Sequence, residues 1–332
     1  MRILIVDDEL VSRKKMDKLI QSLGHQIFVA SDGLEGWEIW KNERPRMVIT
    51  DWVMPRMDGP CLVKKIREAE GSLYTYIIMV TSKEDVHDIV AGMNAGADDF
   101  ITKPYVKEEL SVRIRAGERI IGFIARDIVI FSLAKLVESR DPETGNHLER
   151  IRYYSKTLAE TMASSSNPPQ DIDNQFIENI FLSSPLHDIG KIGIPDHILL
   201  KPGRLDDKEF EIMKTHVLIG YDTLNEALKR YPQADYLEMS AEIALSHHER
   251  LDGGGYPHGL KGRDIPLSAL IVALSDVYDA LVNKRVYKTA YTPDVAKAII
   301  LDGRGTHFDP AVVDAYLARE KDFIEIFNRF KD

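Results

Sequence analysis

Cysteine is almost absent from this chain. Its 332 residues include one cysteine, Cys61, which cannot form a disulfide within the chain. No cysteine pair is present that would supply a zinc ribbon or a redox centre. Chains with so little cysteine are typical of reducing compartments, and we therefore predict a cytoplasmic protein.

Basic residues are too few to balance the acidic ones. The chain has 43 Lys and Arg against 53 Asp and Glu, which gives a formal net charge of −10. A protein held on nucleic acid by backbone electrostatics needs the opposite sign, so we predict no polynucleotide partner. This charge does not exclude the binding of metal ions, because carboxylates are natural ligands of hard cations. It also does not exclude a small anionic substrate held by a few local cations.

The sequence also lacks an apolar run long enough to cross a membrane. At the N-terminus, Asp7 and Asp8 arrive before the apolar core of a signal peptide can form. The most apolar segment, 120–137, is interrupted by Arg126 and Asp127 and falls short of the roughly 20 apolar residues that span a bilayer. We therefore expect no membrane partner.

Short apolar runs alternate with helical patterns in the first 105 residues. Runs without polar alternation are typical of strands covered on both faces, and segment 10–23 has apolar residues at helical spacing. Five such β-α repeats predict a doubly wound, five-stranded parallel sheet. The expected strands are 2–6, 27–30, 47–50, 76–80 and 99–102.

From 107 to 327 the periodicity is helical throughout, so we predict an all-α second domain. Breaks are expected at 164–170, at 201–204 and at 251–266, a glycine-rich loop of a length that is often functional. No Pro/Ser-rich linker separates the halves. We predict domains 1–121 and 122–332, with the last helix of the first running almost directly into the second.

Polar side chains follow four of the predicted strands. Asp7 and Asp8 follow the first, Asp51 the third, Thr81 the fourth and Lys103 the fifth. Ligands of an open parallel sheet bind beyond the carboxyl ends of its strands. Carboxylates so close together need a divalent cation, and oxygen ligands suit Mg²⁺. The central aspartate could then attack a phosphoryl donor, with the hydroxyl and ammonium groups stabilising the phosphoryl oxygens.

Residues 1–121 resemble the receiver domain of two-component response regulators, whose motifs they carry in the same order. The resemblance implies a flavodoxin-like fold. The motifs are the Asp pair, the run DWVMPRMDG at 51–59, Thr81 with Ser82, and Lys103 with Pro104. The resemblance implies phosphorylation by a cognate histidine kinase. It implies these roles: Asp51 as phosphoacceptor; Asp8, Asp51 and the Val53 carbonyl as Mg²⁺ ligands; Asp7 acting through water; Lys103 on the phosphate; Thr81 and Phe100 as the switch pair.

Five of the ten histidines occur in short apolar contexts with acidic neighbours. Glu143 and His147 are spaced to share one helix face. His187 and Asp188 are adjacent and would diverge on a regular helix, yet an ion placed between them could take one nitrogen and one oxygen ligand. Imidazole and carboxylate donors without thiolate suit Fe, Mn, Zn, Ni or Co. Because Asp188 could bridge two ions, the pattern indicates a polynuclear centre that clamps a phosphate. The five are His147, His187, His216, His247 and His248.

From about 126 to 320 the chain resembles the HD-GYP family of HD metallohydrolases, which hydrolyse cyclic di-GMP. The motifs are RDPETGNH at 140–147, HDIGKIGIP at 187–195 and HHERLDGGGYP at 247–257. The resemblance implies two or three transition-metal ions, iron or manganese. Its implied metal ligands are Glu143, His147, His187, Asp188, His216, His247, His248 and Asp276. Its implied substrate contacts are Gly255, Tyr256, Pro257, Arg285 and Lys288, and its catalytic residues are Asp188 and Lys191.

Together the two resemblances imply a response regulator, phosphorylated on Asp51, whose output domain hydrolyses cyclic di-GMP to pGpG or GMP by metal-activated water. Two alternatives stay open. One is a cyclic-dinucleotide sensor or protein-interaction module with little turnover. The other is a phosphodiesterase of another nucleotide, such as cyclic GMP-AMP. A homodimer through the late helices also stays open.

Overall fold

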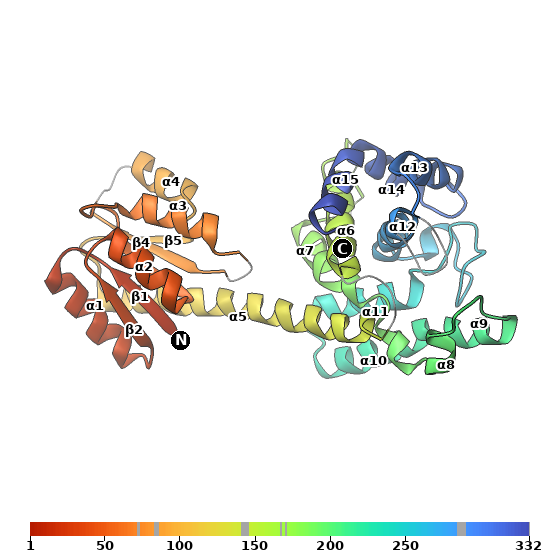
Figure 1. Ribbon diagram of the computed structural model, residues 1–332, viewed down its shortest axis with the longest axis horizontal. Coiled ribbons are helices and arrows are strands. Elements are labelled where there is room, and N and C mark those ends of the chain that lie inside the picture. Colours follow the sequence, from red (N-terminus) through yellow and green to blue (C-terminus); the bar gives the residue numbers. More distant parts are fainter. Residues whose placement is uncertain are drawn as a thin grey trace. The chain divides into compact units, whose positions relative to one another are not determined.

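A computed structural model of the chain describes residues 1–71, 74–82, 86–140, 146–166, 168–169, 171–283 and 290–331. The chain divides into two compact units, Met1–Asp127 and Ile128–Asp332. The division falls within one continuous helix, α5 (Lys107–Glu138), as expected from the missing linker (Figure 1). The predicted domain boundary after residue 121 lies in the same helix. None of the described helices is both long and apolar enough to cross a membrane.

The first unit is built on a five-stranded parallel sheet in the order β2-β1-β3-β4-β5. This confirms the predicted doubly wound α/β fold. The strands are β1 (Arg2–Val6), β2 (Gln26–Ala30), β3 (Met47–Asp51), β4 (Tyr76–Thr81) and β5 (Asp99–Thr102). The helices are α1 (Leu10–Ser22), α2 (Gly33–Glu43), α3 (Gly59–Ala69), α4 (Val86–Asn94) and the first part of α5.

Alternate residues of the central strands enter two separate cores. Ile3 and Ile5 of β1 pack with residues of α1 and α5, whereas Leu4 and Val6 pack with residues of α2 and α3. The expectation that every strand is covered on both faces is wrong for the edge strand β2. Val29 of β2 is 46% exposed, because an edge strand has a neighbour on one side only.

The second unit is helical, as predicted. Among its described residues, the only β pairing is an isolated bridge between Arg304 and Phe308. Helix α12 is buried almost all round and lies in the main core, which explains its continuous apolar sequence. The α-helices are α6 (His147–Ala163), α7 (Asn174–Ser183), α8 (Asp196–Leu199), α9 (Asp207–Lys214), α10 (His216–Arg230), α11 (Asp235–Ser246), α12 (Leu267–Val282), α13 (Pro293–Asp302), α14 (Pro310–Ala318) and α15 (Glu320–Arg329). The 3₁₀ turns are η1 (Ser184–Leu186), η2 (Ile189–Gly193) and η3 (Gly262–Asp264).

Candidate metal centre

An acidic site lies at the carboxyl edge of the sheet. Asp7 and Asp8 follow β1, and Asp51 is the last residue of β3; one carboxylate oxygen of each lies within 4.8 Å of the others. Nζ of Lys103 lies 2.6 Å from Oδ2 of Asp51 and 3.0 Å from Oδ2 of Asp7. Because one ammonium group leaves three carboxylates undercompensated, the oxygen donors fit a Mg²⁺ ion.

The other receiver residues singled out in the sequence lie on β4, on β5 and in the loop after β3. Burial raises the pKa of the Asp51 carboxyl, although Lys103 opposes this shift. Thr81, buried at the end of β4, accepts a hydrogen bond from the Lys103 amide at 2.7 Å through its carbonyl. Phe100 lies on β5 and packs against the α2–α3 core, and Val53 is exposed in the loop after β3. The edge therefore gathers a carboxylate, a cation and a buried hydroxyl.

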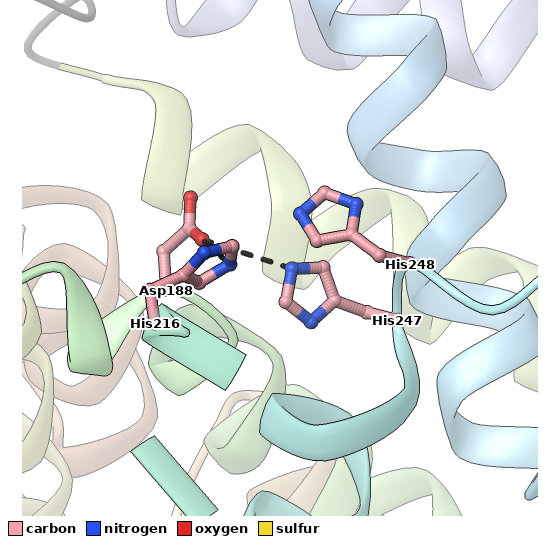
Figure 2. A group of neighbouring side chains, drawn as sticks. All are labelled: Asp188, His216, His247 and His248. Atoms are coloured by element: carbon pink, nitrogen blue, oxygen red, sulfur yellow. Dashed lines mark ion pairs between the residues drawn. The ribbon is translucent and has the colours of Figure 1, made fainter. Parts of the chain in front are cut away.

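Four donor side chains gather in the second unit, in a group that we call cluster A: Asp188, His216, His247 and His248. One ligand atom from each lies within 4.8 Å of the others (Figure 2). Asp188 lies between two 3₁₀ turns, His216 is the first residue of α10, and the two adjacent histidines follow the end of α11. Oδ1 of Asp188 lies 3.2 Å from Nε2 of His216 and 3.7 Å from Nε2 of His247.

A second group, cluster B, contains His147, His187 and Asp276 within the same distance limit. Nε2 of His147 lies 3.8 Å from Oδ1 of Asp276, and Nε2 of His187 lies 3.3 Å from Oδ2 of Asp188. Asp188 therefore directs Oδ1 to cluster A and Oδ2 to cluster B. Because 3₁₀ turns flank these two residues in place of a regular helix, His187 and Asp188 approach each other rather than diverge.

Hydrogen bonds to backbone carbonyls fix which ring nitrogen is available to a metal in three of the histidines: His187, His216 and His247. A carbonyl oxygen can only accept, so each Nδ1 carries the proton and each Nε2 presents a lone pair. Among the described residues, the three Nε2 atoms and Oδ1 of Asp188 are buried without a hydrogen-bond partner. Such a donor set fits bound metal ions. The Nδ1–carbonyl pairs are His187–Ser184 at 2.9 Å, His216–Met213 at 2.8 Å and His247–Ile243 at 2.9 Å.

Electrostatics favour the metal-binding forms of Asp188, His247 and His248, whereas the neighbouring carboxylate favours protonation of His187 as long as no ion is bound. Burial lowers the pKa values of His247 and His248, which favours neutral imidazole. Burial opposes ionisation of Asp188, but Lys191, whose Nζ lies 2.8 Å from Oδ2, and His187 hold its pKa well below the usual range. Burial also opposes protonation of His187, but Asp188 outweighs it and raises the His187 pKa. Asp188 is therefore an anion between the clusters.

Sequence reasoning missed a buried pair behind cluster B. Oδ2 of Asp279 lies 2.8 Å from Nδ1 of His147, and Oδ1 accepts a hydrogen bond from Nε of Arg150 at 2.6 Å. Asp279 thereby fixes the ring of His147 so that Nε2 faces the cluster. A signal was present in the sequence, because Asp279 follows Asp276 by three residues on α12 and so shares its side of the helix.

Comparison with known proteins identifies both units. The model of the HD domain matches residues 132–312, and that of the response regulator receiver domain matches residues 3–115. The chain belongs to the HD domain family. A probable cyclic di-GMP phosphodiesterase of Vibrio cholerae is 41% identical over 99% of this chain and 80% of its own length.

Two further relatives are similar to this chain over all or part of its length. A cyclic di-GMP phosphodiesterase of Thermotoga maritima is 36% identical over 100% of this chain and 94% of its own length. A 3'3'-cGAMP-specific phosphodiesterase of Vibrio cholerae is 40% identical over 60% of this chain and 35% of its own length. The match to the Thermotoga maritima protein covers both units of this chain.

The glycine-rich loop of the HD domain is held by a buried carboxylate that sequence reasoning did not single out. Glu249 is 1% exposed and accepts hydrogen bonds from the amides of His258 at 2.7 Å and Leu260 at 3.0 Å. These bonds satisfy a buried charge and fold the loop back on itself. Glu249 directly follows the paired histidines, so the same turn supports cluster A.

Glycine is required at one position of this loop. A Cβ on Gly255 would lie 2.5 Å from the Glu249 Cα and from the carbonyl oxygen of His248. This close approach places the next residue, Tyr256, against cluster A, where its ring stacks on His248 with centroids 4.7 Å apart. Pro257 then continues the loop. The segment 255–257 therefore borders the HD domain's donor groups, and its contact with substrate stays a prediction.

Three predicted site residues lie outside the described part of the chain. They are Glu143, Arg285 and Lys288. Their roles as a metal ligand and as two substrate contacts stay predictions of the sequence.

Proposed function

We propose that this chain is a metal-dependent cyclic di-GMP phosphodiesterase controlled by a phosphorylated receiver domain. The observation that carries the proposal is the position of Asp188, with one carboxylate oxygen toward each donor cluster. Full-length relatives named as cyclic di-GMP phosphodiesterases support the substrate. The proposed domains are 1–121 and 122–332, and the proposed products are pGpG and GMP.

Clusters A and B would hold the metal ions, for which we propose iron or manganese. Bound ions at such a centre supply Lewis acidity toward a phosphodiester and lower the pKa of water. Asp188 would link clusters A and B, because one of its carboxylate oxygens faces each cluster. The Lys191 ammonium, 2.8 Å from Asp188, is placed to hydrogen-bond a phosphate oxygen beside the carboxylate. Tyr256 presents its ring to the nucleoside portion of the substrate.

The receiver residues would link this reaction to a histidine kinase. Asp51 is proposed to accept the phosphoryl group, with Asp8, Asp7 and the Val53 carbonyl on Mg²⁺. Lys103 already contacts Asp51 and would stabilise the added oxygens, which bring roughly 1.5 to 2 negative charges. Thr81 and Phe100 would respond to that charge and shift the receiver between two states.

Cyclic GMP-AMP is a second candidate substrate. It is favoured by the 40% identity to the phosphodiesterase named for 3'3'-cGAMP, which covers 60% of this chain. The two cyclic dinucleotides share their phosphodiester ring and differ in one base, so the metal centre would treat them alike. Discrimination would have to come from contacts to the base.

Product analysis tests the proposal. The full chain is purified without oxygen, loaded with Fe²⁺ or Mn²⁺, analysed for metal content and incubated with cyclic di-GMP or cyclic GMP-AMP, and products are separated by chromatography. We expect pGpG or GMP from cyclic di-GMP. Tight binding of both nucleotides without product would contradict the proposed activity and favour a sensor. Faster turnover of cyclic GMP-AMP would favour the second candidate.

A further inference from the structure

Helix α9 brings an aromatic ring and a cation to the side of cluster A. The ring centroids of Phe210 and Tyr256 lie 6.2 Å apart with the ring planes at 81°. Nζ of Lys214 lies 5.5 Å from the centroid of Phe210 and 5.8 Å from that of Tyr256. Lys214 ends α9, two residues before the donor His216, so the chain fixes this helix beside the cluster.

The rings form a continuous path from the donor groups to α9. Tyr256 stacks on His248 with centroids 4.7 Å apart, and its centroid lies 6.5 Å from that of His216. Phe210 and Lys214 both lie next to the Tyr256 ring and next to each other. A nucleotide whose phosphate lies at the donors would therefore extend its ribose and base across Tyr256 toward Phe210 and Lys214.

Both α9 side chains are available to a ligand. The Phe210 side chain is 46% exposed, so part of its ring is open to a ligand. Lys214 pairs with Glu211 at 2.6 Å; the Lys214 side chain is 25% exposed and the Glu211 side chain is 68% exposed. Ion pairs this exposed contribute little stability, so the Lys214 ammonium can turn to a better acceptor.

We propose that Phe210 and Lys214, together with Tyr256, form a subsite for one guanine base of a cyclic dinucleotide. This inference rests on the proposed function. Phe210 offers a ring on which a purine stacks. Lys214 has three donors and no acceptor, so it matches the guanine edge, where O6 and N7 both accept. Adenine presents an amino donor in place of O6, and Lys214 therefore favours guanine.

Binding measurements on four variants test the subsite. K214M and F210A alter the subsite. K208M and I212A are the matched controls, because Lys208 and Ile212 are exposed on the same helix. The metal-loaded full chain is titrated calorimetrically with non-hydrolysable phosphorothioate analogues of cyclic di-GMP and cyclic di-AMP. Circular dichroism and metal content are compared to confirm that each variant folds and keeps its ions.

We expect K214M and F210A each to weaken binding of the guanine analogue by about tenfold. The controls should bind as the wild type does. K214M should weaken the adenine analogue less than the guanine analogue. Unchanged affinity in K214M and F210A, or no binding by the wild type, would overturn the proposal. Equal losses for both analogues in K214M would also overturn it, because they would indicate a phosphate contact.

Turnover of natural cyclic di-GMP by the wild type separates the two proposals. If the analogues bind with the expected dependence on Lys214 and Phe210 but no product forms, the subsite is supported and the proposed activity fails. If product forms while neither variant changes analogue binding, the activity is supported and the subsite fails.

Discussion

At the scale of single residues, the donor clusters of the second unit meet at one carboxylate, Asp188, whose two oxygens face different clusters. Oδ1 of Asp188 lies 3.2 Å from His216, and Oδ2 lies 3.3 Å from His187. A histidine offers one lone pair and cannot take this place. An amide offers one acceptor and would direct its donor group to one of the two clusters.

Asp188→Asn keeps the size of the side chain but removes its negative charge and one of its two acceptor oxygens. We expect loss of at least one bound metal ion per chain and a decrease in phosphodiesterase activity of about 100-fold or more, because a carboxylate with two acceptor oxygens is replaced by a group with a single acceptor. Elemental analysis and product chromatography measure both quantities. Asp222→Asn, at an exposed position of α10, is the control. Full metal content in Asp188→Asn would contradict the bridging role.

Asp279 acts on the metal donors through His147. Asp279→Asn should weaken metal binding by about 10- to 100-fold, because the amide no longer fixes the ring as a carboxylate does. It also leaves the buried Arg150 poorly compensated, so we expect a free energy of unfolding lower by about 3 kcal/mol. Chelator competition and denaturant unfolding measure the two effects. Metal affinity equal to that of the wild type would show that His147 needs no such support.

At the scale of elements, the 3₁₀ turn η2 lies against α10 without room for a side chain. A Cβ on Gly190 would overlap the His216 carbonyl oxygen and lie 2.5 Å from the amide nitrogen of Gly220. This contact places Asp188, just before η2, beside His216 at the start of α10. The geometry of cluster A is therefore set by backbone packing as well as by the donor side chains.

Gly190→Ala tests this contact. We expect it to lower the free energy of unfolding by about 3 kcal/mol and to reduce metal content, because backbone atoms must move apart. Gly122→Ala is the control, since a Cβ on this glycine of α5 meets no atom within 4 Å. The control should be neutral or stabilising by up to about 1 kcal/mol. Equal stability of the two variants would contradict the predicted close contact.

At the scale of the whole molecule, two units with different metal chemistry belong to one chain. The first has oxygen donors and a lysine at a sheet edge; the second has imidazoles and carboxylates among helices. One helix, α5, contributes Leu110 and Ile114 to the core of the first unit and Ala134 to a core of the second. Covalent continuity through a helix is the route by which the receiver's state would reach the hydrolase.

Replacing the phosphoacceptor tests that route. We expect a small-molecule phosphoryl donor to change the phosphodiesterase rate of the wild type and to leave the rate of Asp51→Ala unchanged. The same hydrolysis assay, run with and without the donor and Mg²⁺, measures the effect. Identical responses of the wild type and Asp51→Ala would contradict regulation through Asp51.

The sequence by itself determined the sheet, the helical second unit and the identity of most donor groups. Strand runs, helical periods and motif order are local properties, so the five strands were predictable. A short helical connection was predicted as well, but not that it is the single helix α5. Edge exposure at Val29 was not, because it depends on which strand has a neighbour. Metal donors such as Asp276 stand in recognisable motifs, but nothing in their spacing assigns them to cluster A or B.

Only the tertiary structure decided how these residues meet. The contact of Asp188 with His216 and the support of His147 by Asp279 join segments far apart in the chain. The same is true of Phe210 and Lys214 beside Tyr256. Such contacts arise from close packing of helices and turns, which is set by backbone approach at glycines and by side-chain volume. Those quantities act across distance in sequence, so local patterns cannot express them.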